Sequence, residues 1–328
     1  MRYSLAVAVV PLVMALAPPA MAFDCGRAST IVEKAICAEP ALKSLDARME
    51  AAYAEAKSLS SKPEQKMLAR SQKAWIAERE TGCASAGAGL NSCIGKSTQE
   101  RLDLLDGRQE SGPGSDGRII PVFIVQAGTE TQYELDISLL RFAEPRTAGE
   151  KLFNRVAGTI AERVKTGPHG EDTAGHVYVL DEAMTLSYAS SSLISVMDSF
   201  WSDLGGAHGN GGTLNTNIDM KAGRILEIGD LFPEAAVIQL TGDCKEQLIA
   251  EKRSRFSGEN YNPAEDSFLR DDVIGEHVAT LARWQITEGE ASVSFDAYAI
   301  GSYAEGEYDC TYPMTKLKTM AHPGAPLP

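Results

Sequence analysis

Six cysteines constrain this chain of 328 residues more than any other feature. Four of them lie within the first hundred residues: Cys25, Cys37, Cys83 and Cys93. An even number of cysteines in an exported chain is typical of disulfides, so we expect a small domain held by two bridges, whose pairing the spacing leaves open. The remaining two, Cys244 and Cys310, are expected to pair with each other. A four-cysteine zinc site is disfavoured because no two cysteines have the C-x2-C spacing.

The first residues have the composition of a signal peptide. Residues 5–16 form an apolar run that is too short to span a bilayer, and Ala20-Met-Ala22 is a small-residue cleavage site. We therefore expect residues 1–22 to be removed and the mature chain, from Phe23, to be periplasmic or secreted. Because Cys25 is not the first residue after that cut, we expect no membrane anchor after cleavage.

Residues 23–109 have the pattern of a short antiparallel helical bundle. Capping residues, prolines and apolar side chains at helical spacing predict helices over Thr30–Cys37, Ala41–Leu59, Pro63–Thr81 and Ile94–Arg108. A Gly/Ala/Ser-rich loop is expected between Cys83 and Cys93. Residues 110–118 have the Gly, Pro and Ser content of a linker.

Residues 119–320 mix strand and helix patterns. Strand patterns, with apolar residues alternating in Gln132–Arg141, predict strands over Ile119–Gln126, Gln132–Arg141, Val177–Leu180, Met184–Ala189, Leu193–Leu204, Thr213–Met220, Ala291–Phe295 and Glu307–Tyr312. Helices are predicted over Gly149–Lys165 and from Asp230 to Phe256. Because strands and helices are interspersed, we expect an α+β fold, a disulfide-stapled helical bundle followed by a mixed α/β domain whose antiparallel sheet packs on helices. Residues 321–328 are expected to be a tail.

Negative charge is concentrated in the second part of the chain. Residues 23–110 carry 13 Lys and Arg against 13 Asp and Glu, whereas residues 111–328 carry 17 against 32. Nucleic acid is therefore disfavoured as a partner, since binding phosphate needs a basic face. An acidic domain steers a basic partner toward itself, although the same charge also serves solubility.

Five glycines crowd around one histidine, His208, between Gly205 and Gly212. Such a loop is either a recognition surface, with His208 facing a partner, or a strand connection that His208 fixes by bonding nearby backbone or Asp219. Glycine is the residue that turns require, so the second interpretation is favoured.

Seven residues of the second part are candidates for partner binding. Tyrosines dominate protein interfaces and present faces on which sugar rings stack. Two tyrosines border the Gly301-Ser302 turn, whereas Trp75, Trp284 and Phe295 are expected in cores. Acidic residues in two runs would add a negatively charged surface, although such residues often only face solvent and bind nothing. The candidates are His208, Tyr298, Tyr303, Asp271, Asp272, Glu305 and Glu307.

The chain has no catalytic signature. H-E-x-x-H, G-x-S-x-G, S-x-x-K and P-loop motifs do not occur. His169 and His176 share a polar loop with Glu171 and Asp172, but their loose spacing does not favour a metal site. We expect no catalytic residues, no metal and no cofactor.

The N-terminal part resembles the LprI-type lysozyme inhibitor domain over residues 23–107. Members of that family are exported, and some inhibit lysozyme. The resemblance rests on Phe23-Asp-Cys-Gly-Arg-Ala-Ser29, Val32-Glu-Lys-Ala-Ile-Cys37, Pro40-Ala-Leu42, Leu45-Asp46, Gln72-Lys-Ala-Trp75-Ile-Ala-Glu-Arg79, Cys83 and Cys93.

The second part, about residues 119–320, resembles the extracellular domain of RsiV-type anti-sigma factors, which also precedes the catalytic domain of PdaC-like peptidoglycan deacetylases. RsiV uses this region to bind lysozyme. No counterpart of its membrane helix, its sigma-binding part or a deacetylase domain follows here, so we expect neither signalling nor deacetylation. The resemblance rests on Gly205-Gly-Ala-His208, Asp219, Gly223, Asp230-Leu-Phe232, Trp284, Phe295-x-x-Tyr298, Tyr303-Ala-x-Gly306 and Pro313-x-x-x-Leu317.

Both resemblances point to the same partner. We expect a non-enzymatic exported protein that binds lysozyme and inhibits it by occluding its active site. Lysozymes of the common animal type are basic, so the acidic excess would speed their capture at low salt. The alternative is a periplasmic module that binds peptidoglycan or another glycan and inhibits nothing.

Overall fold

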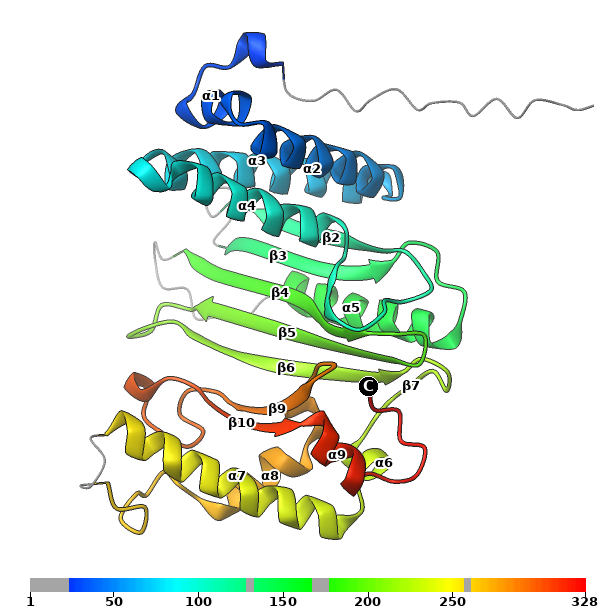
Figure 1. Cartoon of the computed structure of the whole chain (residues 1–328), viewed down its shortest axis with the longest axis vertical. Coiled ribbons are helices and arrows are strands. Elements are labelled where there is room, and N and C mark those ends of the chain that lie inside the picture. The colour runs from blue at the N-terminus through cyan, green and yellow to red at the C-terminus, as the bar shows by residue number, and fades with distance from the viewer. Residues whose placement is uncertain (1–23, 128–132, 167–176, 257–260) are drawn as a thin grey trace, which may run out of the picture.

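The computed structural model describes residues 24–127, 133–166, 177–256 and 261–328. A helical bundle, a seven-stranded sheet and a C-terminal α/β region follow one another along the longest axis of the molecule, in chain order (Figure 1). The predicted α+β class is confirmed.

The bundle contains four α-helices, α1 (Ile31–Ala38), α2 (Pro40–Ser58), α3 (Lys62–Ala84) and α4 (Leu90–Leu105). Thr30 and Glu33 form a capping box at the start of α1, with Thr30 Oγ1 accepting from Glu33 N–H at 3.0 Å and Glu33 Oε2 accepting from Thr30 N–H at 2.9 Å. These reciprocal bonds satisfy amides that the first turn leaves without partners. The predicted helices are present.

Two short-range disulfides close the bundle at one end. Cys25 pairs with Cys37 and Cys83 pairs with Cys93, across separations of 12 and 10 residues. The expected loop between Cys83 and Cys93 is wrong in extent, because α3 continues to Ala84 and α4 already begins at Leu90. The second bridge joins the facing ends of these two helices and so allows only a short 3-10 turn between them.

The bundle packs directly on the first long strand of the sheet, β2 (Ile119–Gln126). Phe123 of this strand is buried in the bundle core among Met49, Leu68 and Leu105. The Arg118 Nε lies 2.9 Å from Glu55 Oε1, and Arg141 binds the Glu64 carboxylate at 2.8 and 2.9 Å. A shared apolar core and these two ion pairs therefore join bundle and sheet.

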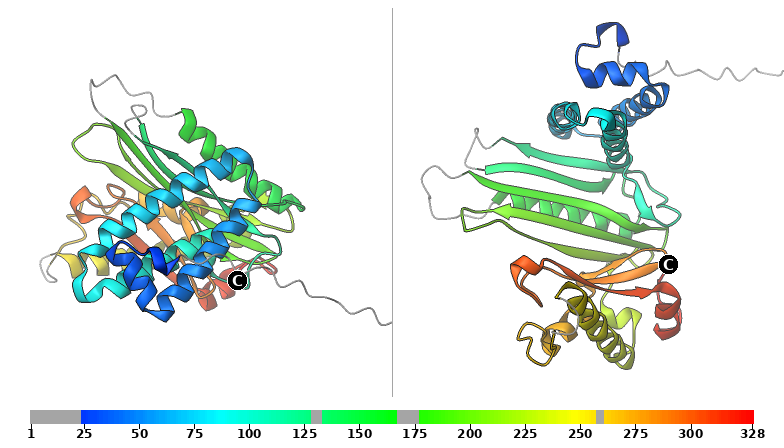
Figure 2. Two further views of the ribbon diagram at one scale, coloured as in Figure 1. Left: turned by 90° about the horizontal axis from the view of Figure 1, so that it is seen from above. Right: turned by 60° about the vertical axis from the view of Figure 1, so that its left-hand side comes forward.

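The large sheet has the strand order β2-β3-β4-β5-β6-β7, and β1 pairs with β4 in parallel. Along this order, neighbouring strands are antiparallel except for β3 and β4, which are parallel. Helix α5 (Ala148–Thr166) lies between these two strands in the chain and covers one face of the sheet (Figure 2). The strands are β1 (Gln109–Ser111), β3 (Tyr133–Phe142), β4 (Tyr178–Ala189), β5 (Leu193–Asp203), β6 (Asn210–Asp219) and β7 (Arg224–Ile225).

Two predicted boundaries in this part are wrong. The two short strands predicted between Val177 and Ala189 form the single strand β4, because Asp181 and Glu182 pair with β5 like their apolar neighbours. The single helix predicted from Asp230 to Phe256 is divided into α6 (Ile228–Leu231) and α7 (Glu234–Arg255). Pro233 lies between them and restricts Phe232 to extended backbone, which ends the first helix.

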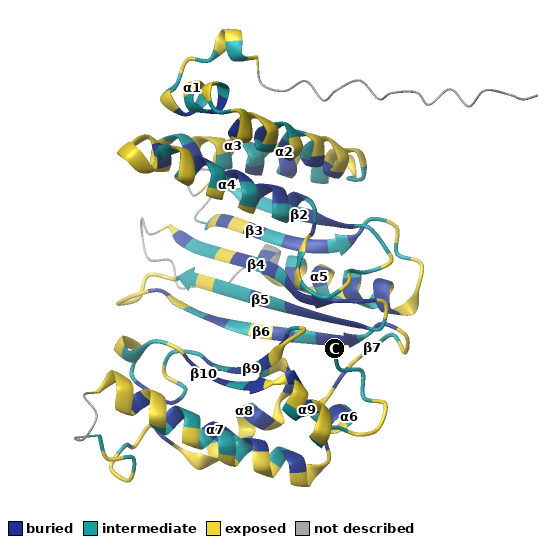
Figure 3. Ribbon diagram, viewed as in Figure 1, coloured by how far each residue is buried: buried dark blue, intermediate teal, exposed yellow. Residues whose placement is uncertain are grey.

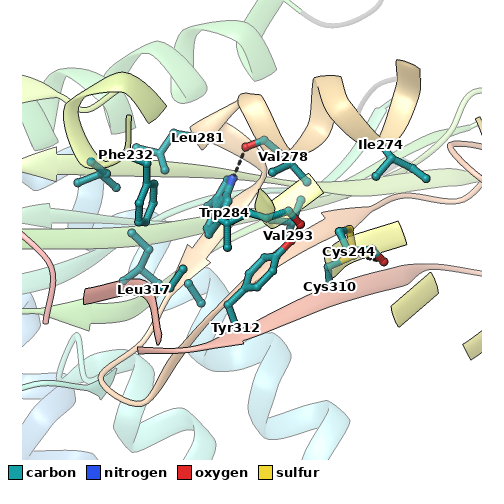
Figure 4. Close-up of a cluster of buried hydrophobic side chains, with 14 of the residues drawn as sticks. Phe232, Cys244, Ile274, Val278, Leu281, Trp284, Val293, Cys310, Tyr312 and Leu317 are labelled. Atoms are coloured by element: carbon teal, nitrogen blue, oxygen red, sulfur yellow. Dashed lines mark hydrogen bonds between the residues drawn. A yellow bond between two sulfur atoms is a disulfide. The ribbon is translucent and has the colours of Figure 1, made fainter. Parts of the chain in front are cut away.

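The C-terminal region packs a three-stranded antiparallel sheet, ordered β10-β9-β8, against helices. Trp284 lies at the centre of its core, where its ring stacks on Tyr312 and its Nε1 donates to Val278 O at 3.0 Å (Figure 4). Cys244 of α7 is bonded to Cys310 of β10, 66 residues away. The elements are β8 (Trp284–Ile286), β9 (Glu290–Phe295), β10 (Tyr308–Pro313), α8 (Asp271–Ala279) and α9 (Met314–Met320).

The segments predicted as linker and tail make specific contacts. Strand β1 includes the first two residues of the expected linker, and Ser111 Oγ donates to Ser187 O at 2.6 Å. In the expected tail, His322 N–H donates to Leu231 O at 2.8 Å, and Leu327 packs on the C-terminal core. No helix in the described ranges combines the length and the apolar character needed to cross a membrane.

Candidate functional site

A cavity of about 370 Å³ opens on the surface of the bundle between α1, α2 and α3. Figure 3 shows that the outer surface of these helices is largely exposed. Four carboxylates and one guanidinium line this cavity, together with apolar and aromatic side chains. We call it the bundle groove, and its residues are Glu33, Ile36, Asp46, Met49, Glu50, Tyr53, Gln72, Trp75, Ile76, Arg79 and Glu80.

Glu50 is a carboxylate of this groove with a buried oxygen that lacks a partner. Its Oε2 is buried and has no hydrogen-bond partner within the described residues. Burial, and then repulsion from Asp46, raises the pKa of Glu50. Burial and repulsion both disfavour the charged form of this carboxyl, and a cationic group brought close to Glu50 would favour it.

The base of the groove is rigid. Arg79 is buried, and its Nη1 donates to Asp46 Oδ1 and to Thr98 Oγ1 at 3.0 Å each. Its guanidinium lies 4.4 Å from the centroid of the Trp75 ring, whose Nε1 donates to Ser97 Oγ at 3.1 Å. Trp75 is therefore half-buried and fixed in orientation, with Ile76 beside it exposed to 42%.

Sequence reasoning missed this groove. Trp75 was expected in a core, and it does pack there, but it also lines the cavity. The one available signal was the pairing of acidic and aromatic residues at Asp46, Glu50 and Tyr53, which helical spacing places along one side of α2.

A second group of side chains lies at the far end of strands β5 and β6, where the predicted residues His208, Tyr298 and Tyr303 meet. His208 stacks on Tyr303 with ring centroids 3.9 Å apart, and its Nε2 lies 3.1 Å from the Tyr298 hydroxyl. Tyr303 Oη donates to Gly209 O at 3.1 Å. We call these three residues the ring cluster. Tyr298 is exposed to 53% and Tyr303 to 39%.

The glycine loop has the shape of a strand connection between β5 and β6. A Cβ atom on Gly209 would lie 2.2 Å from the Trp201 ring, so glycine is required there. His208 Nδ1 bonds to Gly209 O at 2.8 Å, which fixes the loop. Asp219 does not take part in this, because its Oδ1 accepts from the Lys221 and Ala222 amides in the next turn.

Tyr298 has a strained backbone. Its φ of 73° is the one positive value among the non-glycine residues that the structure describes. A bulky residue in this region is uncommon, and it persists only where the surrounding structure holds it there.

The predicted acidic residue Glu305 has internal partners. Lys252 of α7, whose side chain is 1% exposed, binds Asp266 at 2.8 Å and Glu305 at 3.2 Å. Burial by itself would raise the pKa of Glu305, but hydrogen bonds from the Ser302 amide, Tyr308 and Lys252 outweigh it and lower that pKa. This carboxylate is therefore compensated within the fold.

The other predicted acidic residues lie on the surface. Asp271 Oδ1 is 2.6 Å from Lys245 Nζ, and Asp272 forms an ion pair with Arg270. That pair lowers the pKa of Asp272. Glu307 is exposed, and its carbonyl accepts from Arg255. Among the described residues, none of these three acidic residues forms a hydrogen bond or an ion pair with the ring cluster.

In the ranges that the structure covers, no three His, Cys, Asp or Glu side chains converge as metal ligands. His169, His176, Glu171 and Asp172 lie outside the described residues.

Comparison with protein families finds a match for the bundle. Residues 24–105 match the family model LprI, described as lysozyme inhibitor LprI. The match to LprI covers the whole four-helix bundle and both of its disulfides, and therefore also the bundle groove. The disulfides and the LprI match together indicate an exported protein.

The chain is also similar in outline to solved proteins of the DUF3298 family. One from Bacteroides fragilis is 15% identical, with 63% of this chain and 94% of that chain covered and a TM-score of 0.46. One from Pseudomonas aeruginosa is 16% identical, with 66% and 99% covered and a TM-score of 0.46. No curated protein matches the chain.

Proposed function

We propose that this protein binds lysozyme in the periplasm or outside the cell and inhibits it by occluding its active-site cleft. The observation that carries the proposal is the LprI match over the complete helical bundle. The protein acts as a binding partner and not as an enzyme. We assign the binding to the bundle at residues 23–109, with residues 119–320 as a second unit beyond the linker at 110–118.

Charge supports the bundle groove as the contact surface. Lysozymes of the common animal type are basic, and four carboxylates line the groove. Arg79 compensates Asp46 and the capping box of α1 holds Glu33, which leaves Glu50 and Glu80 for a cationic partner. An arginine or lysine of lysozyme that reaches Glu50 supplies the partner which that carboxylate lacks. Such pairs contribute to specificity and to the rate of association.

Packing supports the same surface. Trp75 is held by its hydrogen bond to Ser97 and by the Arg79 guanidinium over its ring, so its exposed part is ordered before a partner arrives. A preorganised aromatic anchor loses little entropy on binding. Ile76 adds exposed apolar area beside it.

Lysis of a cell-wall suspension by a basic animal-type lysozyme, followed by turbidity, tests the proposal. The mature chain is expected to slow lysis, and more strongly at low salt than at 0.5 M. Ile76→Ala should weaken inhibition by about fivefold, because it removes exposed apolar area that lysozyme would bury and leaves the core of the bundle unchanged. Absence of both inhibition and binding at low salt would contradict the proposal, and salt-insensitive inhibition would remove its electrostatic part.

A second function, binding of a peptidoglycan glycan, is favoured by the ring cluster. Two exposed tyrosine rings braced by His208 and a strained Tyr298 backbone form a fixed platform, on which a sugar ring can stack. Retention on insoluble peptidoglycan tests this function. The double variant Tyr298→Ala, Tyr303→Ala should lose retention and keep lysozyme inhibition, and unchanged retention would rule the platform out.

A further inference from the structure

The two faces of the large sheet differ in what covers them. Helix α5 packs on one face, where Leu135 and Ile137 of β3 share a buried cluster with Phe153 of the helix. Side chains alternate along a strand, so Asp136, which lies between these two residues, points to the opposite face. In Figure 1 this opposite face is toward the viewer, and α5 lies behind the strands.

A cavity of about 320 Å³ lies on this opposite face, where β3, β4 and β5 run side by side, and we call it the sheet-face cavity. Alternation places six of its lining residues with their side chains on this face: Asp136, Ser138, Asp181, Ala183, Ser199 and Trp201. Glu182 and Phe200 also line it, but alternation turns their side chains to the other face, where Glu182 binds Arg163 of α5. The cavity therefore presents carboxylates, hydroxyl groups and an indole ring.

The carboxylates and the indole ring form one row across three strands. Asp136 of β3 pairs in register with Asp181 of β4, and Asp181 pairs in register with Trp201 of β5. Neighbouring strands lie about 4.8 Å apart, so the row spans about 10 Å from the first strand to the third. A single small molecule can therefore reach all three side chains.

Both carboxylates of this row lack a partner among the described residues. Neither Asp136 nor Asp181 forms a hydrogen bond or an ion pair there. Arg101 of α4 acts on Asp136 electrostatically, but its guanidinium is buried and donates to Gln72 Oε1 at 2.9 Å. Partial burial, and then repulsion from Asp136 and Glu134, raises the pKa of Asp181. The fold thus holds like charges on adjacent strands, and a cation in the cavity would relieve their repulsion.

Trp201 supplies an aromatic wall beside these carboxylates. The residue is 40% exposed, which is high for a large apolar side chain. Its ring lies against the backbone of Gly209 and Gly211, and a Cβ atom on Gly211 would be 3.3 Å from the Cδ1 atom of the ring. The glycines of β6 therefore let the ring pack closely and hold its orientation. The face of an indole ring attracts cations.

We propose that the sheet-face cavity binds a short linear alkyl diamine. One ammonium group donates to Asp136 and Asp181, and the second lies over the Trp201 ring. The midpoint between the two carboxylate strands is about 7 Å from the strand of Trp201, a distance that a chain of about four or five methylene groups spans. Ser199 Oγ donates to Ala183 O at 3.3 Å, which leaves its lone pairs to accept a further ammonium proton.

The charge of the ligand is what this site selects. A diol of the same length has the same methylene groups but no charge, so it is not a ligand. The proposal does not depend on lysozyme binding, because the bundle groove and the sheet-face cavity share no lining residue.

Titration of the 15N-labelled mature chain with putrescine at low salt tests the proposal, with butanediol as the uncharged comparison. The indole N–H resonance of Trp201 is expected to shift saturably with putrescine and to stay unchanged with butanediol. Absence of a saturable shift, or an equal shift with both compounds, would overturn the proposal. Calcium ions that bind the same residues as tightly would also overturn it, since the site would then be a metal site.

Two variants and a matched control complete the test. The double variant Asp136→Asn, Asp181→Asn keeps the shape of the cavity and removes the repulsion, so it should fold and should lose saturable binding. Trp201→Leu should weaken binding about threefold. Glu290→Gln, an exposed change at the start of β9 outside the cavity, should bind as the unsubstituted chain does. Retained binding by the double variant would contradict the assignment. Lysozyme inhibition should be equal in all of these proteins, which separates this proposal from the first one.

Discussion

The helical bundle and the C-terminal region use their acidic residues in opposite ways. The bundle has balanced charge, yet it holds Glu50 half-buried and without a partner at a surface groove. The C-terminal region contributes to the large acidic excess, yet Asp266 and Glu305 share the buried Lys252. The count of charges in a segment therefore does not locate a binding surface. What matters is which carboxylates the fold leaves uncompensated.

The two regions also differ in their cross-links, and this gives the largest expected effect. Replacing Cys244 and Cys310 by alanine should lower the free energy of unfolding by about 4 kcal/mol, because the bridge closes a loop of 66 residues. Replacing Cys25 and Cys37 should lower it by about 3 kcal/mol, since that loop spans 12 residues. Denaturant unfolding measures both values. A larger loss from the bundle variant would contradict the loop-closure account.

The pairing of two carboxylates with the buried Lys252 in the C-terminal region predicts the next effect. Lys252→Met leaves Asp266 and Glu305 without their cation and should lower the free energy of unfolding by about 3 kcal/mol at neutral pH. In the native chain the pKa of both carboxylates is lowered, so the stability they contribute is present above their unfolded values and is lost as pH falls. The difference between Lys252→Met and the native chain should therefore shrink toward pH 3.

Lys245→Met is the matched control for that experiment. Lys245 lies on the same helix but forms an exposed ion pair with Asp271, which contributes at most about 1 kcal/mol. Equal losses from the Lys252 and Lys245 variants would show that the acidic residues of this region are not compensated in its interior.

The uncompensated carboxylate of the bundle predicts an effect on binding. Glu50→Gln should weaken lysozyme affinity about tenfold, or about 1.4 kcal/mol, as measured by calorimetry at low salt. Glu100→Gln, an exposed change on α4 outside the groove, should leave the affinity within twofold.

The same substitution should not destabilise the fold. Because burial raises the pKa of Glu50, ionisation of this residue costs stability as pH rises through its unfolded value of about 4.5. Glu50→Gln should therefore be more stable than the native chain at neutral pH and equal to it below that value. A loss of stability at neutral pH would show that Glu50 has a partner in solution.

Much of the fold could be predicted from local chemistry. The Thr30–Glu33 capping box, the proline at the start of α2 and the alternation of β3 each act within a few residues, so the sequence alone reveals them. The meeting of His208 with Tyr298 and Tyr303 across about ninety residues agrees with their selection as exposed candidates, although their role in binding stays a prediction.

The groove could not be predicted in this way. Whether Glu50 finds a cation depends on how α2 and α3 pack, and the same packing decides that Trp75 is half-exposed rather than enclosed. In the same manner, Lys252 compensates Glu305 only because α7 lies beside the loop that carries it, 53 residues further along the chain. Which charges are left free depends on partners that are distant in sequence. The periodicity of the sequence does not reveal those partners.

The smallest expected effect concerns the surface carboxylates of the C-terminal region. Replacing Asp271 and Asp272 by asparagine should change the free energy of unfolding by less than about 0.5 kcal/mol and lysozyme affinity by less than twofold, since both form exposed ion pairs. Calorimetry on the same lysozyme gives the comparison with Glu50→Gln. A tenfold loss of affinity here would move the binding surface to the C-terminal region.

Hydrogen exchange of the mature chain, with and without saturating lysozyme, tests most directly whether the bundle groove is the binding surface. Lysozyme should slow amide exchange over residues 46–53 and 72–80, which line the groove on α2 and α3, and should leave residues 265–309 unchanged. Slower exchange over residues 265–309 with no change in the bundle would contradict the account.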